Sequence, residues 1–459
     1  MNIRTRRIIM YSFILVFLIL APLVIFYASG YRFDFKRYKI LKTGTLMVEA
    51  KDIKKADLYL NGKLYEEKFD EKMYIYNLLP GEYEVKMEKE GYYPWQKNIY
   101  VYSSITSFAK DVVLFKKEVP LQIIDGQVIN FSLSPDYQNI VYILANNAFW
   151  ELYNYNLEFK ENTFLARYPE GDQLSLNWAA SSKKILLKID KNYFLFDVEN
   201  KKPGPTLSEI IDFQPEILKW DSQSDNLLYA FSKKAFYKID LFNKKGEKIY
   251  QTEKPVKSEF LVEGNDLFYL QETESHNILN KYNFSFKTDK KIYDLSNSQN
   301  YIFIPSTNNF IGLIDKNLQK LYLIKKVITD NEININASEA IQEFNAQNAV
   351  WDKDEKQLLF YNDFEVFIYD TEKNEQNFIN RFGQIIQKIN WYPTLSYLVI
   401  QFKSQLQIID LTSFNGAKPI TEITKFDEIT NFSLDRKGEI IYFNGKIGKQ
   451  SGLYKINLR

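Results

Sequence analysis

The feature that most constrains the fold is an internal repeat that fills the chain from Val119 to Arg459. In four copies a tryptophan is followed, seven residues later, by the start of a short apolar segment. These tryptophans are Trp178, Trp220, Trp351 and Trp391, and weaker copies begin at Phe131, Phe260, Phe303 and Phe432. A constant spacing of this kind indicates one structural unit that is repeated and packs against its own neighbours.

The period of the repeat predicts a β-propeller. The anchor positions lie near residues 133, 178, 220, 262, 304, 351, 391 and 434. They are about 43 residues apart, which is the length of a propeller blade of four short strands. Eight anchors favour eight blades, and seven blades result if the copy near Phe303 is an insertion. The tryptophan positions and Ser134–Asp136 resemble TolB-like and WD40-like β-propellers at the level of the repeat.

The two ends of the repeat region are expected to meet. The last copy ends after its third strand, at LYKINLR. A three-stranded blade would leave an open edge that invites aggregation. We therefore expect Val119–Asp125, which precedes the first anchor, to supply the missing fourth strand.

Residues 44–116 form a separate block of strand-like segments. The segment EYEVKMEKE alternates, with Tyr83, Val85 and Met87 on one face, which is typical of a half-exposed strand. Asn61-Gly62 and Pro80-Gly81 are turn signals. The expected strands are TLMVEA, ADLYLNG, KMYIYNL, EYEVKMEKE, KNIYVY and AKDVVLF.

Within this block, LLPGEYEVKMEKEGYYPW (Leu78–Trp95), preceded by ADLYLNGK (Ala56–Lys63), resembles a PEGA domain. The sequence departs from that family at its namesake motif, where only Ala56 of the Pro-x-Gly-Ala pattern is kept. The resemblance implies a small extracytoplasmic β-sandwich of a bacterial surface or envelope protein. An unrelated immunoglobulin-like module is the alternative.

A long apolar segment lies near the N-terminus. Ile8–Tyr27 contains no charged residue, and at about 1.5 Å per residue it is roughly 30 Å long, enough to cross a bilayer. Arg4, Arg6 and Arg7 precede it and favour a cytoplasmic N-terminus with the body outside, although Arg32, Lys36 and Arg37 oppose this orientation. A cleaved signal peptide ending near Ala28-Ser29-Gly30 and a buried core helix are the alternatives.

These patterns predict an all-β protein with one N-terminal transmembrane helix. The aromatic content of 16% supports sheet structure. The expected parts are a cytoplasmic N-terminus (1–7), a transmembrane helix (8–27), a linker (28–43), a PEGA-like β-sandwich (44–116) and a β-propeller (117–459).

Composition argues against several classes of function. The chain has no cysteine and one histidine, His276, so thiol chemistry and sites built from several histidines are excluded. With a net charge of +1, the chain lacks the excess of basic residues that nucleic-acid binding requires. We find no phosphate-binding loop, dinucleotide fingerprint or nucleophile elbow.

Three groups of residues invite a functional reading. The four repeated tryptophans are a possible stacking platform, but packing between neighbouring blades is favoured because they recur with the blade. Asp352, Asp354 and Glu355 suggest calcium, but the spacing of a calcium loop is missing and a turn is favoured. His276, beside Glu272 and Glu274, is expected to be a solvated loop residue.

We therefore expect a membrane-anchored extracytoplasmic binding or scaffold protein that recognises a protein or an envelope glycan. The alternatives are a tethered propeller enzyme, such as a glycosidase or lyase, and a structural spacer. Two or more carboxylates within about 10 Å of each other in a deep pocket would favour the enzyme. No residue is assigned a catalytic, cofactor-binding or metal-binding role, no cofactor is expected, and the binding residues are left open.

Overall fold

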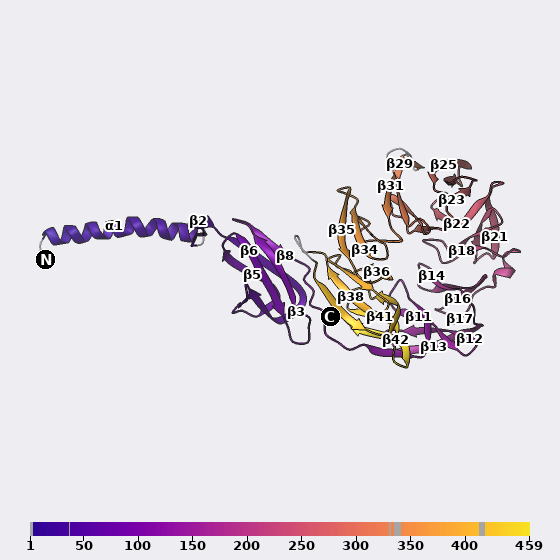
Figure 1. Cartoon of the computed structure of the whole chain (residues 1–459), viewed down its shortest axis with the longest axis horizontal. Helices are drawn as coiled ribbons and strands as arrows, with labels where there is room; N and C mark the ends of the chain where they lie inside the picture. Colours follow the sequence, from indigo (N-terminus) through magenta and orange to yellow (C-terminus); the bar gives the residue numbers. More distant parts are fainter. Residues whose placement is uncertain (1–2, 36, 330–331, 335–340, 413–417) are drawn as a thin grey trace. The chain divides into compact units, whose positions relative to one another are not determined.

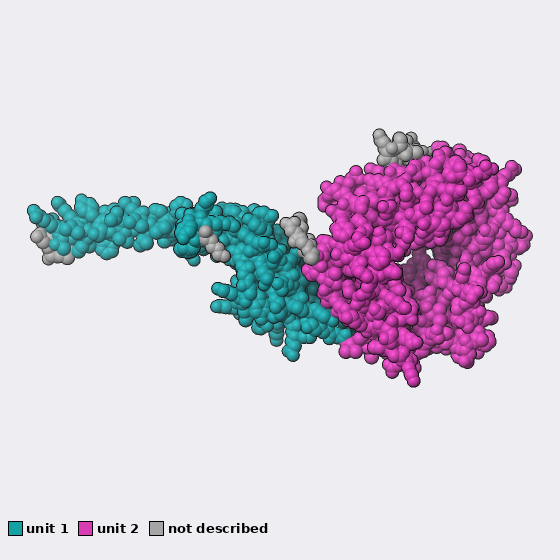
Figure 2. Space-filling view, in the orientation of Figure 1, with its two compact units in different colours: residues 1–118, 412–417, 457–459 teal, residues 119–411, 418–456 magenta. Residues whose placement is uncertain are grey.

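The protein is described by a computed structural model that covers residues 3–35, 37–329, 332–334, 341–412 and 418–459. The chain divides into two compact units, which are coloured separately in Figure 2. Unit 1 comprises residues 1–118, 412–417 and 457–459, and unit 2 comprises residues 119–411 and 418–456. Apart from one N-terminal helix and one short 3-10 turn, the described elements are β-strands (Figure 1).

The helix α1 (Ile3–Ala28) contains the predicted apolar segment and begins five residues before it. Its mean hydropathy reaches 2.9, and none of that window is buried against the protein. Among the described residues it is the one helix that is long and apolar enough to cross a membrane. A helix of this length and composition serves either as a membrane span or as a signal sequence.

Unit 1 continues with eight strands. A two-stranded hairpin of β1 (Tyr31–Asp34) and β2 (Lys39–Lys42) occupies the predicted linker, in which residue 36 lies outside the described residues. Six further strands form one connected sheet system centred on β3. They are β3 (Gly44–Leu60), β4 (Lys63–Leu64), β5 (Phe69–Leu78), β6 (Gly81–Glu88), β7 (Trp95–Val101) and β8 (Thr106–Ala109).

Strand β3 is longer than the sequence predicted. The segments TLMVEA and ADLYLNG, expected as two strands, are joined into one strand of 17 residues. Its first half pairs with β5 and β8, its second half pairs with β4 and β6, and irregular register between Glu49 and Ala56 separates the halves. Such bulges bend a strand, so each half of β3 can pair with two neighbouring strands of its own.

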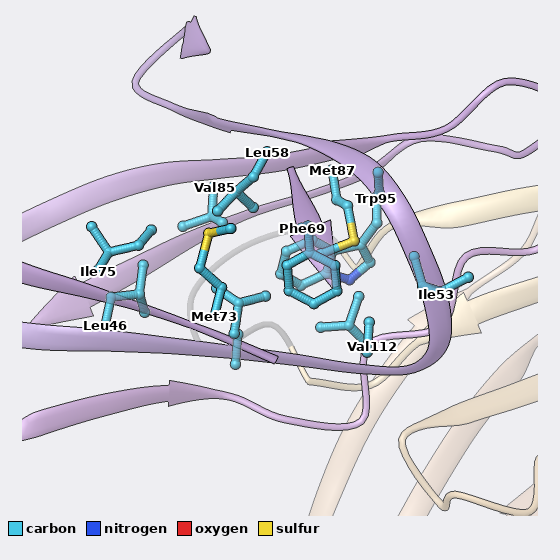
Figure 3. Packing of buried hydrophobic residues seen from close by; sticks show 14 of the residues in the cluster. Leu46, Ile53, Leu58, Phe69, Met73, Ile75, Val85, Met87, Trp95 and Val112 are labelled. Carbon is cyan, nitrogen blue, oxygen red and sulfur yellow. The ribbon is translucent and has the colours of Figure 1, made fainter. Parts of the chain in front are cut away.

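The predicted strand AKDVVLF is wrong. The strand in this region, β8, ends at Ala109, and Asp111 takes a φ of +58°, which interrupts the extended conformation. Val112 and Leu114 are instead buried in the core of unit 1, and Figure 3 shows Val112 there. The expected turn at Asn61-Gly62 is confirmed, because both residues have positive φ and directly connect β3 to β4.

The core of unit 1 gathers apolar side chains from every long strand. Phe69 lies near its centre, between Met73 and Met87 (Figure 3). Phe69, Leu46, Val85 and Met87 are fully buried. Val85 and Met87 point inward from β6 while Glu82 stays exposed, as the alternation in the sequence predicted.

Unit 2 contains, within the described residues, eight antiparallel sheets of four strands each. The first four sheets consist of β10 (Val128–Leu133), β11 (Asn139–Asn146), β12 (Phe149–Asn156) and β13 (Glu161–Pro169); β14 (Leu174–Trp178), β15 (Lys184–Ile189), β16 (Asn192–Asp197) and β17 (Lys202–Pro203); β18 (Ile217–Trp220), β19 (Leu227–Ser232), β20 (Ala235–Asp240) and β21 (Lys245–Gln251); and β22 (Val256–Glu263), β23 (Asp266–Glu272), β24 (Asn277–Asn283) and β25 (Thr288–Leu295).

The other four sheets consist of β26 (Tyr301–Ile304), β27 (Phe310–Asp315), β28 (Lys320–Lys325) and β31 (Ile341–Asn345); β32 (Asn348–Trp351), β33 (Gln357–Tyr361), β34 (Glu365–Asp370) and β35 (Glu375–Arg381); β36 (Lys388–Trp391), β37 (Tyr397–Gln401), β38 (Gln405–Asp410) and β39 (Ile420–Lys425); and β40 (Glu428–Leu434), β41 (Ile440–Ile447), β42 (Gln450–Asn457) and β9 (Leu121–Asp125). A small hairpin of β29 (Val327–Thr329) and β30 (Glu332–Asn334) lies between β28 and β31.

Each predicted anchor lies in the first strand of one of these sheets, at or close to its end. First strands of neighbouring sheets contact each other, as β10 does with β14 and with β40, so they face the centre of the unit. The space-filling view shows unit 2 hollowed at this centre (Figure 2). The copy near Phe303 supplies β26, the first strand of a four-stranded sheet.

The expected pairing of the two ends of the repeat region is observed. β9, from the start of the region, pairs antiparallel with β42 at its end and completes the last sheet as its fourth strand. The edge that β42 would otherwise expose is thereby covered.

Candidate binding site at the channel mouth

A cavity of about 940 Å³ lies where five first strands of unit 2 end. Its wall is built from the last residues of β10, β14, β32, β36 and β40 and from the loops that follow four of them. Because first strands surround the centre of a propeller, this cavity is one mouth of the central channel. Its wall is mostly leucine, valine, proline, tryptophan, serine and asparagine.

The repeated tryptophans connect neighbouring sheets. In three of them the indole N–H donates a hydrogen bond to a backbone carbonyl in the first strand of the preceding sheet. The bonds run from Trp178 to Ser132 (3.2 Å), from Trp220 to Asn177 (3.1 Å) and from Trp391 to Val350 (3.1 Å). Packing between neighbouring blades, which the repeat favoured, is therefore confirmed for these three residues.

Trp351 behaves differently. Its indole Nε1 is buried and has no hydrogen-bond partner among the described residues. Its ring stacks instead on Phe310 of the preceding sheet, with ring centroids 5.7 Å apart and planes at 28°. Trp178, Trp351 and Trp391 also line the channel-mouth cavity, whereas Trp220 does not. The same side chains thus join the sheets and form part of the cavity wall.

The charged groups of the cavity wall are few. Lys353 donates to the carbonyl of Pro393 at 3.0 Å, and the Arg436 side chain is exposed. Asp435, the one carboxylate among the described lining residues, accepts the backbone N–H groups of Glu439 (2.7 Å) and Ile440 (3.0 Å). Both bonds go to Asp435 Oδ1, which therefore caps a turn. The described lining residues do not supply the pair of carboxylates expected of a glycosidase.

The acidic cluster at Asp352 forms a turn, as the sequence favoured. Asp352 is buried and accepts backbone N–H groups from Lys356 (2.8 Å) and Gln357 (3.1 Å). Glu355 takes a φ of +57° in the same turn, and Asp354 is exposed. Within the described ranges, no group of three or more His, Asp or Glu side chains is arranged to hold a metal ion.

His276 lies away from the channel mouth, in the loop before β24. Its Nδ1 is 2.9 Å from Ser275 Oγ, and its Nε2 is 3.2 Å from Asp294 Oδ1. Its side chain is more than a third exposed, and Glu272, its neighbour in sequence, pairs with Lys257 instead. The structure therefore keeps His276 as a loop residue, with an acidic partner that its sequence neighbours did not reveal.

One group near the channel was missed by sequence reasoning. Lys388 begins β36, and its Nζ donates to Asn431 Oδ1 and to the carbonyl of Phe432, both at 2.8 Å. Burial lowers the pKa of Lys388 to about 8, because these neutral acceptors replace water without supplying a negative charge. Lys219 of β18 bonds similarly to the carbonyl of Phe260 (2.8 Å) but has a carboxylate partner, Glu259, at 2.7 Å.

Comparisons with known proteins agree with this architecture at the level of the fold. No family model and no curated protein matches the chain. Among solved structures, the C-terminal WD40 domain of Sif2 is 12% identical, with a TM-score of 0.50 over 74% of this chain and 99% of that domain. The Dos1 propeller (11% identical, TM-score 0.48, 74% and 95% covered) and a eukaryotic initiation factor (11%, 0.49, 79% and 90%) are also similar. The eight four-stranded sheets and the likeness to the Sif2 domain give unit 2 the fold of a WD40-like β-propeller.

Proposed function

We propose that this chain is a membrane-anchored extracytoplasmic scaffold whose propeller binds a protein or a cell-envelope glycan at the channel mouth. In this proposal the eight sheets of unit 2 are the eight blades of a closed ring, and α1 is an uncleaved anchor. Residues 44–116 of unit 1, which lie between α1 and the propeller in the sequence, form a PEGA-like β-sandwich, and the protein is bacterial.

The observation that carries the proposal is the composition of the channel-mouth cavity. Three tryptophans and several aliphatic side chains offer apolar surface, and serine, asparagine and backbone groups offer hydrogen bonds. Concave surfaces that combine apolar area with a few polar groups are typical of binding sites. A volume of about 940 Å³ accommodates a short peptide segment or a few sugar rings.

We propose binding rather than catalysis at this site. The one carboxylate of the described wall, Asp435, is occupied by two backbone N–H groups of its own turn. The histidine of the chain lies in a different loop and is paired with Asp294. General acid–base catalysis needs titratable groups that face a common substrate, and these two do not share a cavity.

The orientation rests on α1 and its flanks. Arg4, Arg6 and Arg7 form its first turns, and basic residues are retained on the cytoplasmic side of a membrane. The resemblance of residues 44–116 to an extracytoplasmic domain favours the same orientation. Protease added to intact cells or spheroplasts is expected to digest both units, and a body that stays fully protected until the membrane is broken contradicts the topology.

Site-specific photo-crosslinking in the native membrane tests the binding site. A photoreactive amino acid is placed at Arg436, an exposed residue of the cavity wall, and in a matched variant at Phe242, which is 81% exposed and does not line the cavity. We expect adducts of defined mass, protein or polysaccharide, from position 436 and not from position 242. Equal labelling at both positions, or none at either, contradicts a site at the channel mouth.

A further inference from the structure

The hairpin β1–β2 directly follows the membrane-type helix. α1 ends at Ala28, and β1 begins at Tyr31. The strands pair in the register Tyr31 with Lys42, Arg32 with Leu41, Phe33 with Ile40 and Asp34 with Lys39. If α1 spans a bilayer, this hairpin lies at the surface where the chain leaves it.

One side of the hairpin is apolar and faces solvent. Tyr31, Phe33 and Ile40 share a face because alternate residues of a strand, and residues opposite each other in the pair, point the same way. The exposed fractions are 43% for Phe33, 79% for Phe35, 81% for Tyr38 and 62% for Ile40. Four large apolar side chains exposed within eight residues are unusual for a surface that meets only water.

The hairpin is fixed to the end of α1 by several contacts. The Arg32 guanidinium donates to the carbonyl of Tyr27 at 2.7 Å and lies 3.6 Å from the centre of the Tyr27 ring. Phe26 and Tyr31 meet edge to face, with ring centroids 5.4 Å apart. The backbone N–H of Thr43 donates to the carbonyl of Gly30 at 2.8 Å. The apolar face is thus held beside the last turn of the helix.

The hairpin is also strongly basic. From Tyr31 to Lys42 the sequence has five basic residues and one acidic residue, Asp34. Asp34 is buried, and it accepts the backbone N–H of Arg37 at 3.2 Å and pairs with the Arg37 side chain at 3.7 Å. Lys39 and Lys42 are exposed. A surface that combines exposed aromatic rings with basic side chains is complementary to the interface of an anionic bilayer.

We propose that the hairpin Tyr31–Lys42 binds the anionic phospholipid headgroups of the membrane that α1 crosses, with Phe33, Phe35, Tyr38 and Ile40 inserted among them. Aromatic rings favour the headgroup region, and each basic side chain near an anionic surface adds about 1 kcal/mol of attraction. This inference rests on the proposed anchoring by α1. It assigns the hairpin a role in setting the orientation of unit 1 relative to the membrane surface.

Because the chain has no cysteine, single cysteines can be introduced and spin-labelled without background. Three full-length variants, Ile40→Cys, Phe17→Cys and Phe242→Cys, are placed in nanodiscs of anionic or zwitterionic phospholipid. Position 40 probes the hairpin, position 17 lies in the middle of α1, and position 242 is an exposed control in unit 2. Electron paramagnetic resonance then compares collisions with oxygen, which dissolves in lipid, and with a nickel chelate, which stays in water.

We expect the ratio of oxygen to nickel accessibility to be highest at position 17, lowest at position 242 and intermediate at position 40. At position 40 the ratio should be severalfold higher in anionic than in zwitterionic nanodiscs. In the background of Ile40→Cys, the added pair Phe35→Ser and Tyr38→Ser should lower it to the value at position 242, and neutralising Lys39 and Lys42 to glutamine should remove the difference between lipids.

The outcomes separate the anchor from the hairpin. A water-like value at position 17 overturns the membrane span and, with it, the hairpin proposal. A lipid-like value at position 17 with a water-like value at position 40 overturns the hairpin proposal alone. Protection of position 40 from both reagents indicates cover by protein, such as a second copy of the chain, and equal values in both lipids contradict recognition of anionic headgroups.

Discussion

At the scale of single residues, the repeated tryptophans perform two tasks with one side chain. Their rings fill the space between neighbouring sheets, and in three of the four the indole N–H joins the first strand of its own sheet to that of the preceding one. Three rings also form the wall of the channel-mouth cavity. Binding at this wall therefore depends on residues that also hold the ring together.

Trp391 and Trp351 provide a matched test of the indole hydrogen bond. Trp391→Phe removes a bond to the carbonyl of Val350, whereas Trp351→Phe removes an N–H that has no partner among the described residues. We expect Trp391→Phe to lower the free energy of unfolding by about 1 kcal/mol more than Trp351→Phe does. Urea unfolding of the detergent-solubilised chain, followed by tryptophan fluorescence, measures this difference, and equal losses would show that the bond contributes nothing.

Lys388 predicts a dependence of stability on pH. Its pKa is lowered from 10.5 to about 8 in the folded protein, so between these values the unfolded chain binds more protons than the folded one. Stability then rises as the pH increases from about 8 to about 10.5, and below pH 8 the full cost of the buried charge is present. The free energy of unfolding of the unmodified protein should rise relative to that of Lys388→Met by on the order of 3 kcal/mol across this window.

The comparison with Lys388→Met serves as its own control. Tyrosines whose pKa is raised by burial, such as Tyr361 at about 12, also affect stability at high pH, but they are present in both proteins and cancel in the difference. Parallel pH profiles for the two proteins would rule out the buried charge as the cause.

Residue-scale features were predictable from the sequence only where the repeat carried them. The spacing of Trp178, Trp220, Trp351 and Trp391 predicted packing between blades, and the acidic cluster at Asp352 was recognised as a turn. The exception at Trp351 was not predictable, because it depends on Phe310 in the preceding sheet. The burial of Lys388 was not predictable either, because it is imposed by β40 of the following sheet.

At the scale of secondary-structure elements, local turn signals were more reliable than strand boundaries. Asn61-Gly62 forms the predicted turn because only a few residue types tolerate positive φ. The extent of β3 was missed because its length is set by the pairing of its two halves with different strands. The sequence predicted a linker where the hairpin β1–β2 forms, because the apolar residues of the hairpin have no core to face.

Asn61 allows the two contributions to this turn to be separated. Its φ is +50°, and its side-chain oxygen accepts the backbone N–H of Glu84 at 2.9 Å. Asn61→Gly keeps the backbone freedom and loses the hydrogen bond, whereas Asn61→Ala loses both. We expect Asn61→Ala to destabilise the turn by about 1 kcal/mol more than Asn61→Gly, because alanine is strained at positive φ.

Hydrogen exchange of the peptides that cover β3, β4 and β6 measures this local effect. Exchange should be fastest in Asn61→Ala, slower in Asn61→Gly and slowest in the unmodified protein. Peptides from unit 2 serve as the internal reference, and equal exchange in the two variants would show that backbone strain is not the deciding factor.

At the scale of the whole molecule, the ring of unit 2 depends on two segments that lie at opposite ends of its sequence. The need for closure was predictable, because the last copy lacked a fourth strand and the segment before the first copy was available. The cavity at the channel mouth was not predictable, because its wall combines the ends of five strands that lie far apart in the sequence.

The closure leaves no room for a side chain at Gly452, which pairs with Asp125 between β42 and β9. A Cβ at this position would lie 2.3 Å from the carbonyl oxygen of Ile124. We expect Gly452→Ala to force β9 away and to cost about 1–3 kcal/mol of stability. Gly383→Ala, at a position with nothing within 4 Å and no positive φ, is the matched control and should change stability by less than about 0.5 kcal/mol.

Hydrogen exchange shows whether the loss in Gly452→Ala arises at the closure. Amides of β9 and β42 should exchange faster than in Gly383→Ala, while those of β19 and β20, which lie in a different sheet, should change little under native conditions. This pattern follows because opening the last sheet frees β9 without breaking the pairing inside the other sheets. If all sheets of unit 2 lose protection together, the ring opens only by global unfolding. If β9 keeps its protection, the pairing with β42 tolerates the added methyl group. The closure is then looser than the contact at Ile124 implies.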